Sequence, residues 1–364
     1  MYFTKYKPQI LLSLITVLAT VLMWFVFYFN IPQKIGFPKS SLETIFANYD
    51  GPNYMAIAKC GYNKDCLGPN FSLPLPLEYY PAHLPGFPTL IRIFNVITTG
   101  PKAMLFVTLI GSVLLSLTSY ALFKSFWLSF FLIFFPPRLF ILRVIGAPET
   151  WFISLTLLSI IYFKKQKYLL SAIFASLSLI FKTPAILLGL TYLIFCLKDF
   201  KNFKKYLVYL FMPITLLFIF YYYKLQTGDF LAYLHSGDNF HLNPLPYLVF
   251  ISNRTWVNSI WLEDILYIYF FALLGIKKLY KKFKMDILFL YPMIFLIATF
   301  FVSHRDISRY IAPIYPFLLF AFNKKLIKKE YQAILFLLIP AVILYSINFI
   351  LGNTAPIADW KPYL

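Results

Sequence analysis

The chain has 364 residues, of which 60% are hydrophobic and only 13% are charged, and its formal net charge is +19. Soluble globular domains are about half apolar and about a quarter charged, so this composition excludes an ordinary soluble enzyme. The basic excess would also suit a nucleic-acid-binding protein, but most lysines occur in short runs between apolar segments, as in cytoplasmic loops of membrane proteins. We therefore expect a polytopic membrane protein whose single domain covers residues 1–364, in contact with membrane lipids and not with nucleic acid.

Apolar segments long enough to cross a bilayer as helices recur along the chain. The first has a basic start and no small-residue cleavage site behind it, so we expect a retained anchor rather than a signal peptide. Two short segments that meet at Lys182-Thr183-Pro184 are expected to form a helical hairpin. We expect about eleven spans, near residues 9–29, 101–123, 126–146, 148–163, 168–182, 183–197, 206–223, 260–276, 286–302, 310–322 and 331–351.

The basic residues predict the orientation of these spans, because cytoplasmic loops carry an excess of lysine and arginine. One set of alternate loops holds 19 lysines and three acidic residues, whereas the other set holds the remaining 14 basic and 11 acidic residues. The N-terminus is therefore expected in the cytoplasm and the C-terminus outside. Frequent Lys, Ile and Phe suggest an AT-rich genome, so we expect a bacterial plasma membrane, although an endoplasmic reticulum membrane would obey the same charge rule. The segments expected outside are 30–100, 136–149, 224–259 and 303–309.

The first of these outer loops contains Asp50, followed by an apolar pattern that ends at Gly61 and indicates a short helix. Taken alone, Asp50-Gly51 is also a common turn sequence. A carboxylate just before a helix start is kept ionised by the helix dipole, and an ionised carboxylate can act as a general base toward a hydroxyl. The same loop holds Cys60 and Cys66. An oxidising compartment permits a disulfide between them, and two unpaired thiols are the alternative.

Several short motifs follow one another along the chain. They are Tyr49-Asp50-Gly51, Tyr54, Ile57-Ala58, Gly61-Tyr62, Tyr79-Tyr80-Pro81, Gly86-Phe87-Pro88, Gly146–Thr150, Lys182-Thr183-Pro184, Gly228–Ala232, and Arg309-Tyr310 with Pro313. In this order they resemble the motifs of the GPI mannosyltransferase II family and its bacterial relatives, over roughly residues 45–315. Tyr49 stands where that family has tryptophan, residues 82–85 interrupt the pattern, and Lys182-Thr183 replaces Thr-Arg.

The resemblance implies an all-α polytopic fold of the GT-C type, whose exoplasmic first loop carries short interfacial helices. It also implies transfer of a hexose, mannose in that family, from a polyprenyl-phosphate sugar to a hydroxyl of a glycan, lipid or protein acceptor. The reaction would invert the sugar, with Asp50 as the general base. No cofactor is expected with certainty, and the absence of an Asp-x-Asp sequence near Asp50 gives no support for a divalent metal.

A phosphate-bearing donor would need cationic partners at headgroup depth. Arg305 and Arg309 are four residues apart and would share a helix face, although they also suit interfacial anchors. Lys182 at the hairpin tip is a further candidate, and its alternative is a snorkelling lysine. Arg138 lies in an otherwise apolar run with Arg143. Either of these two arginines could instead form a structural pair with Glu149.

Other polar residues of the outer loops are candidates for contact with an acceptor or for support of the loop. These are Tyr54, Glu78, His83 and Glu149, and for Glu78 and His83 an ordinary solvated loop position is the alternative. His235, Asp238 and His241 could suggest a metal, but their spacing does not place all three on one helix face. No zinc-type Cys and His spacing occurs, so no metal ligands are predicted.

Three other functions fit parts of the pattern. An oligosaccharide ligase or polymerase on the same face would need a large outer loop rich in Arg and His, for which 224–259 is a modest candidate. A lipid-linked glycan transporter or flippase would carry charges buried in the middle of spans. A membrane scaffold would leave the ordered polar motifs without an explanation.

Overall fold

The computed structural model describes residues 2–71, 73, 75–237, 241–251, 262–304 and 306–364. In these ranges all regular secondary structure is helical, apart from two isolated β-bridges. The longer helices are α1 (Tyr2–Tyr28), α7 (Gly100–Phe123), α10 (Glu149–Lys164), α11 (Tyr168–Phe181), α12 (Ile186–Lys198), α13 (Phe211–Thr227), α15 (Leu262–Phe283), α16 (Ile287–Phe300) and α20 (Lys329–Leu351).

Shorter helices connect these elements and build the first outer loop. The α-helices among them are α2 (Ile31–Lys34), α3 (Leu42–Phe46), α4 (Gly51–Cys60), α5 (Lys64–Asn70), α6 (Gly86–Phe94), α8 (Phe126–Phe134), α9 (Pro137–Val144), α14 (Ala232–His235), α17 (Ile307–Tyr310), α18 (Tyr315–Ala321) and α19 (Asn323–Leu326). The 3₁₀ helices are η1 (Leu77–Ala82), η2 (Thr183–Ala185), η3 (Phe200–Leu210), η4 (Leu248–Phe250), η5 (Ala312–Ile314) and η6 (Lys361–Tyr363).

Four helical segments in the described ranges are long and apolar enough to cross a membrane: Tyr6–Tyr28, Gly100–Phe123, Phe200–Thr227 and Lys329–Leu351. The bent pair α8 and α9 would make a fifth. In the described ranges, each predicted span overlaps a helix or a pair of helices. Several of these helices are apolar but only 10–17 residues long, which is short for a membrane crossing. The long apolar helices indicate a membrane-embedded protein, and the count of eleven spans stays a prediction.

The segment 126–146, predicted as one span, is broken in the middle. The axes of α8 and α9 differ by 74°, and the break falls at Pro136-Pro137. Proline lacks a backbone N–H and restricts the residue before it, so α8 cannot continue through this dipeptide. The bend directs Arg138, in the first turn of α9, toward the polar centre of the protein.

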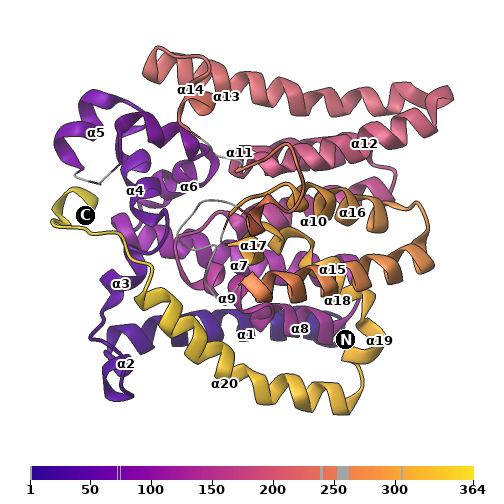
Figure 1. Cartoon of the computed structure of the whole chain (residues 1–364), viewed down its shortest axis with the longest axis horizontal. Helices are drawn as coiled ribbons and strands as arrows, with labels where there is room; N and C mark the ends of the chain where they lie inside the picture. The colour runs from indigo at the N-terminus through magenta and orange to yellow at the C-terminus, as the bar shows by residue number, and fades with distance from the viewer. Residues whose placement is uncertain (1, 72, 74, 238–240, 252–261, 305) are drawn as a thin grey trace.

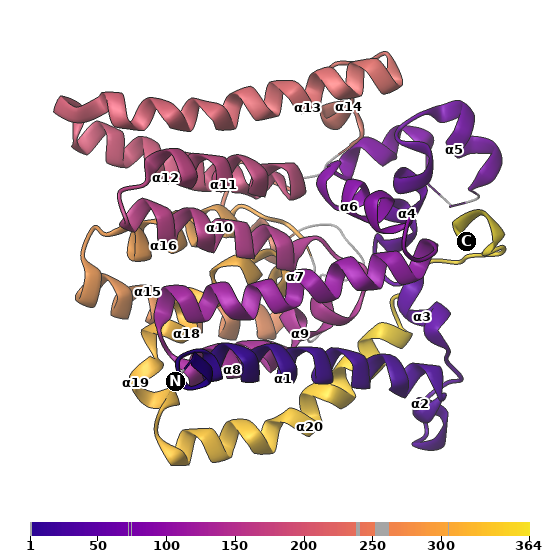
Figure 2. The same cartoon turned by 180° about the vertical axis from the view of Figure 1, so that it is seen from behind.

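The two ends of the helix bundle differ in composition. Figures 1 and 2 both show α2–α6 and the C-terminus at one end, and the N-terminus, α19 and the α12–α13 connection at the other. The connections at this second end carry the lysine runs. Two of them are joined by an ion pair between Lys164 Nζ and Asp286 Oδ2 at 3.2 Å. The lysine-rich loops are therefore grouped in space, whereas their side of the membrane stays a prediction.

The centre of the bundle is formed by α7, which packs against α1, α8 and α10. Gly111 permits the close approach of α7 to α10, because a Cβ atom there would lie 2.5 Å from Thr150 Oγ1 and 2.6 Å from the Trp151 ring. The Trp151 indole in turn donates to the Val107 carbonyl at 2.9 Å. Small residues commonly allow such backbone approach between membrane helices. This contact fixes the start of α10, where Glu149 lies.

Candidate functional site

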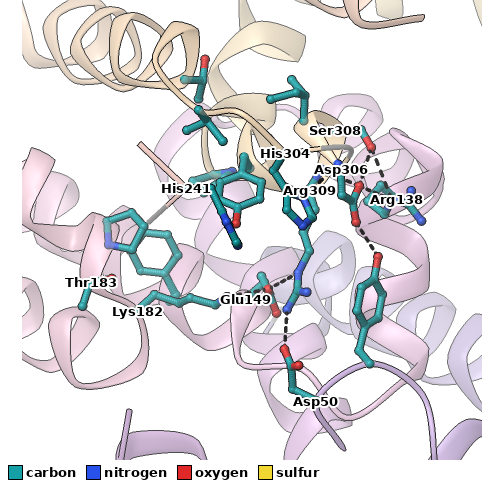
Figure 3. Close-up of a pocket in the computed structure, with 18 of the residues that line it drawn as sticks. Asp50, Arg138, Glu149, Lys182, Thr183, His241, His304, Asp306, Ser308 and Arg309 are labelled. Atoms are coloured by element: carbon teal, nitrogen blue, oxygen red, sulfur yellow. Dashed lines mark hydrogen bonds and ion pairs between the residues drawn. The ribbon is translucent and has the colours of Figure 1, made fainter. Parts of the chain in front are cut away.

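A cavity of about 1320 Å³ lies where the first loop meets the ends of several helices. Its lining comes from the start of α4, α9, the start of α10, η2, α17 and the end of α20. Figure 3 shows the charged side chains from these elements converging on one another. Segments far apart in the sequence therefore contribute to one polar centre.

Asp50 occupies the N-cap position of α4, with Pro52 in the first helical turn. Its side chain makes no capping hydrogen bond within the described structure; it approaches Arg309 Nη2 at 3.4 Å and His83 Nε2 at 3.5 Å. Burial alone would raise the pKa of Asp50, but the hydrogen bond with His83 and the charges of Arg309 and Lys182 outweigh it and hold the pKa well below its usual range. The carboxylate is therefore ionised at neutral pH.

Arg309 bridges two carboxylates that belong to different helices. Its Nε donates to Glu149 Oε1 at 2.8 Å, and its Nη2 faces Asp50. The guanidinium also lies over the Tyr49 ring, 4.3 Å from the centroid, in a cation–π contact. Arginine suits this place because its planar fork can meet several acceptors at fixed angles. Asp50 and Glu149 are thereby held on either side of one cation.

Glu149 also pairs with Lys182, whose Nζ lies 3.0 Å from Glu149 Oε1. The expectation that Arg138 or Arg143 pairs with Glu149 is wrong. Arg138 pairs with Asp306 at 2.9 Å. Arg143 is fully buried and donates to the Ser112 carbonyl at 2.7 Å. Both arginines find their partners on elements far away in the sequence, at the start of α17 and on α7, so spacing along the chain misled the prediction.

Asp306 is a central residue that the sequence analysis did not single out. It accepts hydrogen bonds from the Tyr49 hydroxyl at 2.6 Å and from the Ser308 hydroxyl at 3.1 Å, besides its pair with Arg138. As the N-cap of α17 it also accepts from the Arg309 backbone N–H. An acidic N-cap three residues before an arginine was the available signal. Arg305, predicted to share a helix face with Arg309, lies outside the described residues.

The predicted acceptor residues fall into two groups. His83 is buried, and its ring packs edge-to-face with the Tyr54 ring, with the ring centroids 5.1 Å apart. Both residues line the cavity beside Asp50. The Tyr62 hydroxyl donates to the His83 carbonyl at 2.6 Å and holds this segment in place. Glu78, by contrast, is exposed, pairs with Lys64 at 2.7 Å and does not line the cavity.

Cys60 and Cys66 form a disulfide, so the thiol alternative does not apply to this structure. The bridge joins the last residue of α4 to α5 and encloses Tyr62. Since Asp50 caps the other end of α4, the disulfide restrains the helix that presents the carboxylate.

The two histidines that were weighed as metal ligands and not predicted to bind one have different surroundings. His235 pairs with Asp229 at 2.6 Å and is exposed, whereas His241 lines the cavity with its ring 4.6 Å from that of His304. Asp238 lies outside the described residues. Within the described ranges, no three His, Cys, Asp or Glu side chains are grouped closely enough to hold a metal ion.

Comparison with known proteins adds no assignment to this geometry. No protein-family model, curated protein or solved structure matches the chain.

Proposed function

We propose that the chain is a membrane glycosyltransferase of the GT-C type, which moves a hexose from a polyprenyl-phosphate sugar to an acceptor hydroxyl with inversion. Mannose is the sugar suggested by the family that it resembles. The observation that carries the proposal is the ionised Asp50 carboxylate, which faces a large cavity beside Arg309 and Lys182. A base and two cations at one cavity suit attack by a hydroxyl on a phosphate-activated sugar.

The donor phosphate is assigned to the Lys182 side of the cavity. Lys182 pairs with Glu149, yet 28% of its side chain is still exposed, so its ammonium can take a further anionic partner. Arg309 provides the second cation. Charge-assisted hydrogen bonds to phosphate oxygens are about twice as strong as neutral ones.

An apolar part of the same cavity lies next to the cations and suits the prenyl chain. It is lined by Ile186, Leu187, Ile265, Ile268 and Phe295. Burial of isoprenoid carbons against such side chains is favourable by about 25 cal/mol per Å². A donor with an anionic head and a long apolar tail therefore matches the cations and the apolar part of the cavity.

In the proposed step, the acceptor oxygen attacks C1 of the donor sugar from the face opposite the phosphate. A bond forms between that oxygen and C1, while the bond between C1 and the phosphate oxygen breaks and its electron pair stays on the phosphate. Asp50 accepts the hydroxyl proton, and Lys182 stabilises the departing phosphate. Arg309 positions Asp50 and keeps it ionised. No general acid is needed, because phosphate is a stable leaving group.

Of the alternatives, the transporter is the one that a specific feature favours, since Arg143 is a charge buried between helices. Its Nη1 lies 3.4 Å from Ser116 Oγ and its Nη2 donates to the Leu132 carbonyl at 3.4 Å. Arg143 does not line the cavity. Because these contacts stabilise a helix junction away from the cavity, they support a structural role more than a transport path.

The central test replaces the proposed base. Asp50→Asn should reduce sugar transfer from labelled polyprenyl-phosphate-mannose in membranes by about 10²- to 10⁴-fold, the usual contribution of a general base. The free energy of unfolding should change by less than about 1.5 kcal/mol, since Asn keeps the shape and Arg309 keeps Glu149. Asp65→Asn is the matched control, because Asp65 is exposed in the same loop. Undiminished transfer by Asp50→Asn would contradict the proposal.

The proposed orientation places the cavity outside a bacterial plasma membrane, with the lysine-rich end in the cytoplasm. A Cys196→Ser background leaves only the paired cysteines. In this background, Asn70→Cys should react with a membrane-impermeant maleimide added to intact cells, whereas Lys201→Cys should not. Both positions are exposed. Labelling at 201 with protection at 70 would invert the orientation.

A further inference from the structure

The segment after α20 returns to the first loop and pairs with the residues that precede Asp50. Asn48 and Thr354 form an antiparallel bridge. The Ala355 N–H donates to the Ala47 carbonyl at 2.8 Å, and the Tyr49 N–H donates to the Asn353 carbonyl at 3.3 Å. Residues 353–355 are thus held against residues 47–49, directly before Asp50.

This segment and the end of α20 give the cavity a wall unlike the one beside Lys182. The wall presents an aromatic ring, two amides and a hydroxyl, from Tyr345, Asn348, Asn353 and Thr354. Among the nearest charges, Arg138 pairs with Asp306 and lies 3.7 Å above the Phe349 ring, while the Asp264 carboxylate also lines the cavity and acts on Tyr345. This side of the cavity therefore offers hydrogen bonds and ring surface, and its carboxylates disfavour an anionic ligand.

These groups are suited to a sugar. Amides both donate and accept, so they match the paired roles of sugar hydroxyls, and an exposed tyrosine ring offers an apolar face with a polar edge. The Asn353 side chain is half-buried and lines the cavity, and its Nδ2 has no acceptor among the described residues.

Resting on the function proposed above, we propose that the acceptor is an uncharged glycan whose terminal sugar lies against Tyr345, Asn348, Asn353 and Thr354. The acceptor then enters from the C-terminal side and the donor from the Lys182 side, with Asp50 between them. Asn353 is paired to Tyr49, the residue that precedes Asp50, so this wall lies beside the segment that carries the carboxylate. The wall sets the acceptor class, whereas the cations set the donor class.

The test measures sugar binding separately from transfer, with the full chain in detergent micelles. Mannotriose, maltotriose and N-acetylchitotriose are titrated by saturation-transfer NMR against the natural sequence, Asn353→Ala and Asn348→Ala. At least one trisaccharide should bind, and each variant should weaken it about fivefold, the loss of one neutral hydrogen bond. Asn95→Ala, on the exposed end of α6, should leave binding unchanged.

Each outcome has a distinct consequence. If no trisaccharide binds, or if the Asn353 and Asn348 variants bind as the natural sequence does, the acceptor wall is overturned, even where Asp50→Asn abolishes transfer. If binding depends on Asn353 while Asp50→Asn retains full transfer, the proposed base fails and the sugar site stands. A hydroxyl-bearing peptide that labels in membranes while no sugar binds would assign the acceptor to protein instead.

Discussion

Two clusters of acidic and basic side chains share the cavity, and only the first has members that are open to it. In this first cluster, Asp50 and Lys182 have 29% and 28% of their side chains exposed, whereas Glu149 and Arg309, which link them, have 4% and 15%. In the second, Asp306 and Arg138 have only 8% and 11% exposed. Asp306 is surrounded by Tyr49, Ser308 and a backbone N–H, so its oxygens are occupied by the protein itself.

The difference separates a cluster that can meet a ligand from one that fixes shape. Arg309 belongs to both: its side chain faces Asp50 and Glu149, while its backbone N–H is capped by Asp306. The closed cluster therefore positions the arginine that the open cluster uses. Variants of the closed cluster should act mainly on stability, and variants of the open cluster mainly on chemistry.

The largest effect on stability is expected for Asp306→Ala. Removal of one partner of a buried ion pair leaves an uncompensated charge, here Arg138, and should lower the free energy of unfolding by about 3–5 kcal/mol. Denaturant or thermal unfolding of the purified chain in detergent measures this. Asp50→Asn, which keeps its neighbours hydrogen-bonded, is the comparison. If the two variants unfold alike, the division into an open and a closed cluster is wrong.

The open cluster should show itself in the pH dependence of transfer. Because the folded-state pKa of Asp50 is lowered, the carboxylate stays ionised above the unfolded value of about 3.9, and its stabilising contribution is lost only as pH falls through the lowered folded value. Protonation of Asp50 should therefore not reduce transfer at mildly acidic pH. Lys182→Met removes one of the charges that lower this pKa, so the acidic limb of kcat/KM, which reports groups of the free enzyme, should move to higher pH. A limb that does not move would show that another group controls it.

Local patterns in the sequence were enough to place helices and the Asp50 cap, but not to choose partners. Apolar runs mark the helices that coincide with predicted spans, and the apolar pattern between Asp50 and Gly61 indicates the short helix that Asp50 precedes. These features depend on neighbours within a few residues. The pairing of Tyr49 with Asp306 joins residues 257 apart, and nothing in either local sequence specifies it.

The same limit explains the wrong assignment of a partner to Glu149 and the unnoticed role of the C-terminal segment. The charges near Glu149 in the sequence are Arg138 and Arg143, yet they contact Asp306 and the Ser112 carbonyl, which belong to distant segments. The segment at 353–355 is short and has no strong periodicity, and its pairing with residues 47–49 is visible only once α20 is placed. Both features depend on contacts between segments far apart in the sequence, and a single sequence does not reveal such contacts.

The smallest effect is expected where the two clusters meet, at Tyr49. Burial first, and then the neighbouring Asp306 carboxylate, raise the pKa of Tyr49 above its ordinary value, so the phenol stays protonated and donates to Asp306. Tyr49→Phe keeps the ring under Arg309 and removes only this hydrogen bond to a charged group, which should cost about 1.5 kcal/mol of folding free energy. Transfer should fall only a few-fold, because Asp50 and Arg309 keep their contact. A loss of transfer as large as that of Asp50→Asn would show that the Tyr49 hydroxyl takes part in the chemistry, and the closed cluster would then belong to the reaction as well as to the framework.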